Sequence, residues 1–191
     1  MAEPSTHPIL QTERLRLSKP AVKDVPAIIA LANNENVSRT TANMPFPYGE
    51  EHAVFWLNMA NEGFANKTAY IFAIRNGTTE EFLGGIGLHV HAADEKAVIG
   101  YWVGEPHWNK GYVTEALGAI ICFAFEELGM NKLEAVHLLE NPASGKVMIK
   151  NGMVQEGVSI ADSKRFGKFR DIARYRLLRS EYHLNAGKQK T

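Results

Sequence analysis

The sequence predicts an α+β (α/β) fold with a largely antiparallel sheet, because strand and helix patterns mix along the chain without strictly alternating. The clearest pattern is an apolar strand, a glycine-bearing turn and a long amphipathic helix within Ala97–Leu128. A hairpin signal, Asn76-Gly77, separates two further strand patterns. The 191 residues suffice for one hydrophobic core and are short for two. We therefore expect a single domain over residues 9–183, between a mobile N-terminal tail at 1–8 and a C-terminal tail at 184–191.

The first third of the chain predicts one strand and two helices. Leu10–Ser18 alternates apolar and charged residues, as a half-buried strand does. Asp24–Ala32 and Glu50–Glu62 supply apolar residues for the buried side of a helix. Between them, Asn33–Tyr48 is predicted to be a turn-rich connection with two closely spaced prolines.

The middle of the chain predicts two paired strands, Ala69–Arg75 and Phe82–Ala92. Glycines in the second strand weaken its β propensity and indicate a bulge or a close backbone approach, at Gly84, Gly85 and Gly87. His89 and His91 share one face if this stretch is extended. They are either surface or hydrogen-bonded histidines or two ligands of a metal site, for which the nearby sequence offers no clear third ligand.

The second half predicts alternating strands and helices. Ala97–Val103 is the central strand, and Val113–Leu128 is the long helix with Gly129 as its C-cap. Leu133–Leu139 is the next strand, and Asn141–Lys150 is a helix with Asn as N-cap and Pro in the first turn. The chain closes with strands Met153–Ile160 and Ile172–Leu178, which flank the basic loop Lys164–Arg170.

Composition excludes several classes of partner. The formal net charge is zero, so the protein has no basic field that would attract nucleic acid or an anionic membrane. No apolar run is long enough to cross a membrane, and the N-terminus lacks the pattern of a signal peptide. The single cysteine, Cys122, forms no internal disulfide and suits a reducing cytoplasm. Its position within a helix favours a packing residue over a nucleophile.

The turn at Gly104–Tyr112 favours an anion, because the helix that follows presents unpaired N–H groups and the positive end of its dipole. Gly111 lets backbone approach a ligand without a Cβ in the way. Lys110 adds a charge and Thr114 a hydroxyl, so phosphate is the natural ligand. The alternative is an ordinary strand-to-helix turn in which Gly111 only satisfies the geometry.

This loop, Trp108-Asn109-Lys110-Gly111-Tyr112-Val113, resembles the acyl-CoA loop of the GNAT N-acetyltransferases, Gln/Arg-x-x-Gly-x-Gly/Ala, although its first and last residues depart from that pattern. The resemblance extends from LQTERLRL near the start to FRDIARYRLLRSEY near the end, about Leu10 to Tyr182, with the motifs in the family's order. It is strongest with the branch typified by RimJ and RimL, acetyltransferases of ribosomal-protein N-termini, which Trp108 also fits.

The resemblance implies a six- or seven-stranded mixed sheet with about four flanking helices and a V-shaped splay between two central strands. It implies acetyl-CoA as co-substrate and no metal. The pyrophosphate would lie at the loop, and the pantetheine arm would pair with the central strand. The residues at the matching positions are Trp102, Val103, Gly104, Trp108, Asn109, Lys110, Gly111, Tyr112, Val113, Thr114, Asn141 and Ser144.

The catalytic residues are less defined by the resemblance. Many GNAT enzymes carry a Tyr seven residues after the Asn as general acid, and here that position is Met148, which cannot donate a proton. Either Ser144 or a water protonates the thiolate, or it leaves unprotonated. Glu105, His107 and Glu140 lie at loop positions near the expected cleft as candidate bases, although Glu105 and His107 could equally be solvated loop residues. The predicted catalytic set is Ser144, Glu105 and Tyr101.

The sequence thus predicts an acetyl-CoA-dependent N-acetyltransferase acting on a primary amine, either a protein N-terminus or a small molecule. Zero net charge favours neither the basic ribosomal surface nor a cationic aminoglycoside as acceptor. The alternative is a non-catalytic acyl-CoA sensor, which Met148 and Ile149 favour, since the resembled branch often has Glu at the second of these positions. Both a monomer and a homodimer are compatible with the sequence.

Overall fold

The computed structural model describes residues 7–188, which form eight strands and six α-helices. The strands are β1 (Leu10–Gln11), β2 (Leu15–Ser18), β3 (Ala69–Asn76), β4 (Phe82–His91), β5 (Lys96–Val103), β6 (Lys132–Leu138), β7 (Val154–Arg165) and β8 (Lys168–Leu178). The helices are α1 (Val25–Ala32), α2 (Glu35–Thr40), α3 (Glu50–Ala65), α4 (Tyr112–Cys122), α5 (Pro142–Lys150) and α6 (Arg179–Lys188).

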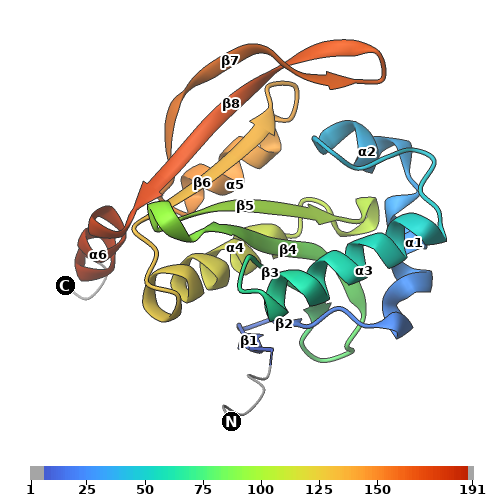
Figure 1. Ribbon diagram of the computed structural model, residues 1–191, viewed down its shortest axis with the longest axis horizontal. Coiled ribbons are helices and arrows are strands. Elements are labelled where there is room, and N and C mark those ends of the chain that lie inside the picture. The colour runs from blue at the N-terminus through green and yellow to red at the C-terminus, as the bar shows by residue number, and fades with distance from the viewer. Residues whose placement is uncertain (1–6, 189–191) are drawn as a thin grey trace.

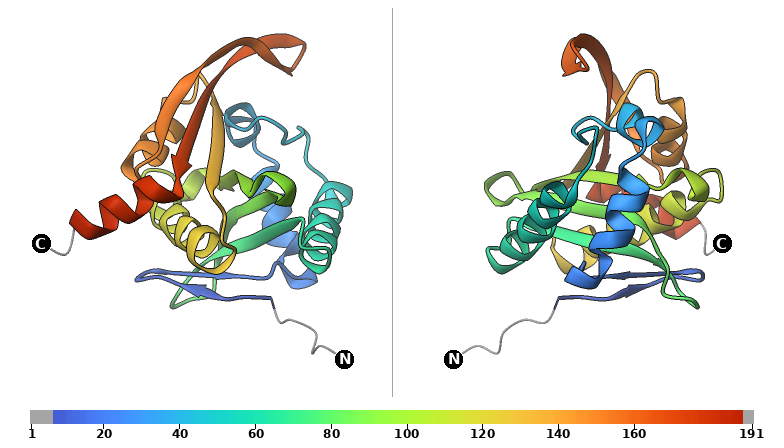
Figure 2. Two further views of the ribbon diagram at one scale, coloured as in Figure 1. Left: turned by 60° about the vertical axis from the view of Figure 1, so that its left-hand side comes forward. Right: turned by 90° about the vertical axis from the view of Figure 1, so that its right-hand side faces the viewer.

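The strands form one mixed sheet in the order β1-β2-β3-β4-β5-β6-β8-β7, in which only β5 and β6 are parallel. Helices α1 and α3 cover one face, and α4 and α5 cover the other (Figures 1 and 2). The larger hydrophobic core lies between the sheet and α4, where Phe72, Leu117 and Ile120 are fully buried. The predicted α+β class is confirmed, with eight strands instead of six or seven.

The two central strands separate along their length, as the resemblance implied. Parallel pairing runs from Lys96 opposite Lys132 to Ile99 opposite Ala135 and then stops, although both strands continue. Beyond this point β5 and β6 no longer form hydrogen bonds to each other along their facing edges. The sheet therefore opens into a V at the carboxyl end of β5.

The N-terminal region differs from the prediction in two places. The expected strand over 10–18 is interrupted, because the Thr12 hydroxyl accepts a bond from the Leu15 amide (3.0 Å) and makes a local turn between β1 and β2. The turn-rich 33–48 contains helix α2, which Asn34 caps by accepting from the Asn36 and Val37 amides. The cap residue was visible in the sequence, but a helix of six residues leaves too little periodicity to recognise.

The C-terminal part departs more strongly. The predicted basic loop 164–170 belongs to strands β7 and β8 and to the tight turn at Phe166 and Gly167 between them. These strands form a long hairpin that projects past the rest of the sheet toward α2 (Figure 1). The predicted tail at 184–191 is helical through Lys188 as part of α6. Residues 189–191 and 1–6 of the predicted tails lie outside the described residues.

Smaller expectations are also resolved. Helix α4 begins at Tyr112 and passes at Cys122 into a π-turn over Phe123–Glu127. Cys122 is exposed, so its prediction as a packing residue was wrong; the helix turns this position away from the core that its neighbours fill. The close approach predicted for β4 is confirmed, because a Cβ on Gly84 would lie 2.2 Å from the Trp102 carbonyl oxygen. Within the described residues, no helix is both long and apolar enough to cross a membrane.

Candidate active site

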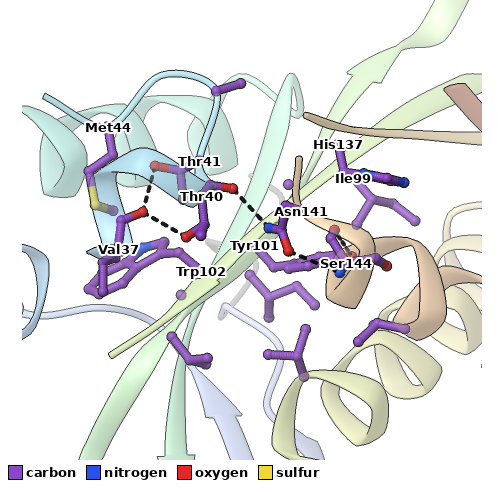
Figure 3. A pocket seen from close by; sticks show the side chains of 18 of the residues that line it. Val37, Thr40, Thr41, Met44, Ile99, Tyr101, Trp102, His137, Asn141 and Ser144 are labelled. Carbon is purple, nitrogen blue, oxygen red and sulfur yellow. Dashed lines mark hydrogen bonds between the residues drawn. The ribbon is translucent and has the colours of Figure 1, made fainter. Parts of the chain in front are cut away.

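A cavity of about 1180 Å³ opens at the V of the sheet. Its walls come from the segment between α2 and α3, from α3 itself, from β4, β5 and β6, from the loop before α4 and from α5. In Figure 3, Val37, Thr41, Met44 and Trp102 lie on one side of Tyr101, and Ser144 lies on the other. One continuous space therefore joins the predicted cofactor loop to the predicted acceptor region.

The loop before α4 forms one end of this cavity. Asn109 and Gly111 both have left-handed backbone, with φ of 59° and 79°, so the chain doubles back before α4 begins. The indole N–H of Trp108 donates to the Val103 carbonyl oxygen (2.9 Å) and fixes the loop against β5. The first-turn amides of α4 have no intrahelical partner and can bind a phosphate. Of the predicted loop residues, the cavity is lined by Trp108, Asn109, Gly111, Tyr112, Val113 and Thr114.

Two predicted cofactor residues, Lys110 and Gly104, do not line the cavity. The Lys110 carbonyl oxygen accepts from the guanidinium of Arg14 (3.1 Å), which also pairs with Glu115 (2.7 Å) and lies 5.0 Å from the Tyr112 ring centroid. Arg14 thus fastens the first turn of α4 to the start of the sheet and places a cation beside Gly111. This role of Arg14 could not be predicted from the sequence, because the two segments are 96 residues apart.

Further cations were missed on α5. Lys146 and Lys150 line the cavity one helical turn apart, on the side that faces the first turn of α4. Their i, i+4 spacing was the available signal, but the same spacing is common on solvent-exposed faces. Together with the amides of the loop, these lysines suit the phosphate groups of a nucleotide-like ligand.

Tyr101 and Ser144 meet at the centre of the cavity. The Tyr101 phenol lies 2.7 Å from the Ser144 hydroxyl and also donates to the Ser144 carbonyl oxygen (3.2 Å). Burial raises the pKa of Tyr101 to about 12, so the phenol is a neutral proton donor at physiological pH. Asn141 caps α5 by accepting from the Ser144 amide (3.3 Å) and donates to the Thr40 carbonyl oxygen (3.0 Å). These three predicted residues are brought together.

Glu105, by contrast, lies outside the cavity lining. Its carboxylate accepts bonds from the side-chain amides of Asn34 (2.7 Å) and Asn36 (2.9 Å) at the start of α2. These contacts give Glu105 the role of joining α2 to the loop after β5. His107 lines the cavity and is buried; burial lowers its pKa, which keeps the imidazole neutral. Within residues 7–183, no group of three His, Cys, Asp or Glu side chains could hold a metal ion.

The tip of the β7–β8 hairpin bonds to α2 and to the segment after it, which form one wall of the cavity. The guanidinium of Arg165 donates to the Ser38 carbonyl oxygen (3.1 Å), to the Ser38 hydroxyl (3.2 Å) and to the Met44 carbonyl oxygen. The Ser38 hydroxyl in turn donates to the Met44 carbonyl oxygen (2.7 Å). One side chain from the far end of the chain therefore orders the segment that lines the acceptor side.

We expect Arg165→Ala to weaken acceptor binding without affecting acetyl-CoA. Without Arg165, the segment between Ser38 and Met44 would have to be ordered when the acceptor binds. The entropic cost of fixing one or two side chains would raise the acceptor KM by about three- to tenfold. The matched control is Arg174→Ala, since Arg174 bonds Ser159 and Asp162 within the same hairpin and does not line the cavity. Equal effects of both variants on the acceptor KM would contradict the role of Arg165.

Comparisons with known proteins agree with this geometry. The family model for the acetyltransferase (GNAT) domain matches residues 14–154. An uncharacterized N-acetyltransferase of Bacillus subtilis (strain 168), YoaA, is 31% identical over 154 residues, which are 79% of this chain and 85% of that protein.

Two solved structures show the same fold at lower identity. RimL, a ribosomal L7/L12 α-N-protein acetyltransferase in complex with coenzyme A, aligns with a TM-score of 0.82 at 18% identity and covers 90% of this chain and 98% of its own. Spermidine N-acetyltransferase from Vibrio cholerae, in complex with CoA and spermine, aligns with a TM-score of 0.78 at 20% identity. The alignment covers 90% of this chain and 99% of that one. The extent of the family match and the identity to YoaA establish that this chain belongs to the GNAT family of acetyltransferases and is an acetyl-CoA-dependent acyltransferase.

Proposed function

We propose that the protein transfers the acetyl group of acetyl-CoA to a primary amine by direct attack within a ternary complex. The observation that carries the proposal is the cavity at the V, which joins the loop before α4, the unpaired edge of β5 and the Tyr101–Ser144 pair. The phosphates would be held by the first turn of α4, with Lys146 and Lys150 opposite. The pantetheine arm would pair with β5 beyond Ile99, where β6 has diverged.

The chemistry needs a neutral amine, a held thioester and a protonated leaving group. The amine nitrogen attacks the carbonyl carbon, the C–S bond breaks, and the sulfur takes a proton from the Tyr101 phenol. Ser144 holds this phenol in place, and water receives the proton that the amine gives up. Met148, at the position of the family's usual acid, is buried among apolar residues, so Tyr101 takes that role here. Most of the rate comes from holding the two reactants together.

We expect Tyr101→Phe to lower kcat by about 10²-fold, a typical contribution of one general acid, with little change in acetyl-CoA affinity. Since Tyr101 stays protonated below its pKa of about 12, wild-type activity should keep rising with pH as the acceptor amine loses its proton. The control is Tyr175→Phe, because the Tyr175 phenol bonds Gln155 and lies outside the cavity lining. A pH–rate profile of each variant decides the assignment; an unchanged kcat in Tyr101→Phe would exclude it.

The proposal is tested by thermal unfolding with acetyl-CoA and by thiol release with a panel of primary amines. Acetyl-CoA at about a hundred times its Kd should stabilise the fold by roughly 2.7 kcal/mol. Stabilisation with amine-dependent thiol release supports the proposal. Stabilisation without release for any amine, or no stabilisation at millimolar acetyl-CoA, would contradict the proposal.

Both a protein N-terminus and a small-molecule amine fit this proposal as the acceptor. RimL acts on a ribosomal protein and the Vibrio cholerae neighbour on spermidine, so the fold accommodates both. Location in the cytoplasm, absence of a nucleic-acid partner, and a monomeric or homodimeric state also stay predictions.

A further inference from the structure

The acceptor side of the cavity offers no carboxylate that could pair with a second positive charge. None of the described residues that line the cavity is Asp or Glu. Glu105 is engaged by Asn34 and Asn36, and Glu51 is largely exposed beside His52. An acceptor with several ammonium groups would therefore lose hydration without gaining an ion pair.

Aromatic and sulfur-containing side chains form the wall of this side instead. Trp56 of α3 and Trp102 of β5 meet edge to face, with ring centroids 6.4 Å apart, and both line the cavity. Phe82 supports Trp102 from behind at 6.0 Å. Further apolar lining residues here include Val37, Met44, Tyr48, Phe55 and Met59. A ligand that covers this apolar surface is stabilised by the area removed from water, and the indole rings favour aromatic groups.

Two glycines shape the floor of this side. A Cβ on Gly85 would lie 2.6 Å from Trp56 Cζ2 and 3.0 Å from Trp102 Nε1, so glycine lets both indoles approach β4 closely. A Cβ on Gly100 would meet no atom within 4 Å, so the space above it is open. Gly100 precedes Tyr101, the proposed proton donor. Side chains alternate along a strand, so this open space lies on the face of β5 that carries Trp102, opposite the Tyr101 side chain, next to the V where β5 and β6 part.

We infer that the acceptor is a small primary amine carried by an apolar, aromatic-sized body without a second cationic group. The inference rests on the proposed function, since it concerns the acceptor side of the same site. In this arrangement the body lies over Gly100 against Trp56 and Trp102, and its amine points toward the centre of the cavity near Tyr101.

The test compares amines of similar size and different charge with the wild-type protein. Phenethylamine and isopentylamine are set against spermidine, an aminoglycoside and a peptide with N-terminal serine, and kcat/KM is measured by thiol release. We expect the apolar amines to exceed spermidine by at least about tenfold, as expected when one charged group is left unpaired. A preference for spermidine, the aminoglycoside or the peptide, or no acetylation of either apolar amine, would overturn the inference.

Stabilisation by acetyl-CoA is measured in the same samples, so that failure of the inference about the acceptor can be told apart from failure of the proposed function. If acetyl-CoA stabilises the protein and a cationic amine is the better acceptor, the inference fails and the proposed function stands. If acetyl-CoA neither binds nor is consumed, both fail.

Variants locate the binding surface. Trp56→Ala and Gly100→Leu should each lower kcat/KM for phenethylamine by about tenfold or more, the first by removing a wall and the second by filling the open space. Acetyl-CoA stabilisation should persist in Trp56→Ala, because Trp56 lies on α3 and not on the strand edge proposed for the pantetheine arm. The matched control is Phe169→Ala, an exposed aromatic of β8 that does not line the cavity and should not change kcat/KM. Unchanged kcat/KM in both cavity variants would overturn the inference.

Discussion

Gly111→Glu should abolish acetyl-CoA binding, with at least about a hundredfold loss of affinity, because the new carboxylate would stand where the phosphates bind. The side chain would project from the N-cap of α4, and its Cβ alone would lie 3.3 Å from an Arg14 guanidinium nitrogen. The variant therefore adds a negative charge and engages the Arg14 guanidinium beside the loop. In thermal unfolding, acetyl-CoA should stabilise wild type by roughly 5–10 °C and the variant not at all.

This substitution also strains the backbone, since φ at Gly111 is 79° and a side chain there costs about 1–2 kcal/mol. Gly129→Glu is the matched control. Gly129 has φ of 68°, its Cβ would meet no atom within 4 Å, and it does not line the cavity. Both variants should unfold at lower temperature than wild type, but Gly129→Glu should keep its full response to acetyl-CoA. If acetyl-CoA stabilised Gly111→Glu as much as Gly129→Glu, the loop would not be the site that holds the phosphates.

Asp24→Asn should destabilise the fold by about 3–5 kcal/mol, the largest effect on stability that we expect from one side chain. The Asp24 carboxylate and the Arg75 guanidinium pair through two bonds of 2.8 and 2.7 Å, and both side chains are only 4% exposed. Ser18 accepts from Arg75 (2.9 Å), and Asp24 accepts from the Ala21 amide (2.8 Å). Asparagine would keep the shape but leave the guanidinium charge buried without a counter-charge.

Denaturant unfolding of Asp24→Asn against Glu35→Gln measures this effect. Glu35 pairs with Arg39 at 2.7 Å, a distance equal to that of the buried pair, but the two side chains are 54% and 65% exposed. Solvent screening limits such a pair to about 1 kcal/mol or less. Similar losses in both variants would mean that burial does not determine the cost of breaking the Asp24–Arg75 pair.

The local elements could be predicted from the sequence because their signals are local. The strand, turn and helix around Gly111 follow from apolar periodicity and one glycine, and Asn141 identified the start of α5 through its capping chemistry. Where the signal was short or polar, as in α2 and the ends of β7 and β8, tertiary contacts decided the structure instead. Arg165 lies in the predicted loop, yet its bonds to Ser38 and Met44 hold it in the hairpin.

By itself, the sequence determined the fold class, the family and the strand, turn and helix around Gly111, since each depends on residues that are neighbours in the chain or on motif order. Only the tertiary structure decided which side chains meet in the cavity. It paired Tyr101 with Ser144, moved Glu105 from the expected cleft to the start of α2, and brought Arg14 to the loop before α4. The physical reason is that a hydrogen bond or ion pair depends on distance in space, and residues forty to a hundred positions apart leave no periodic trace of it in the sequence.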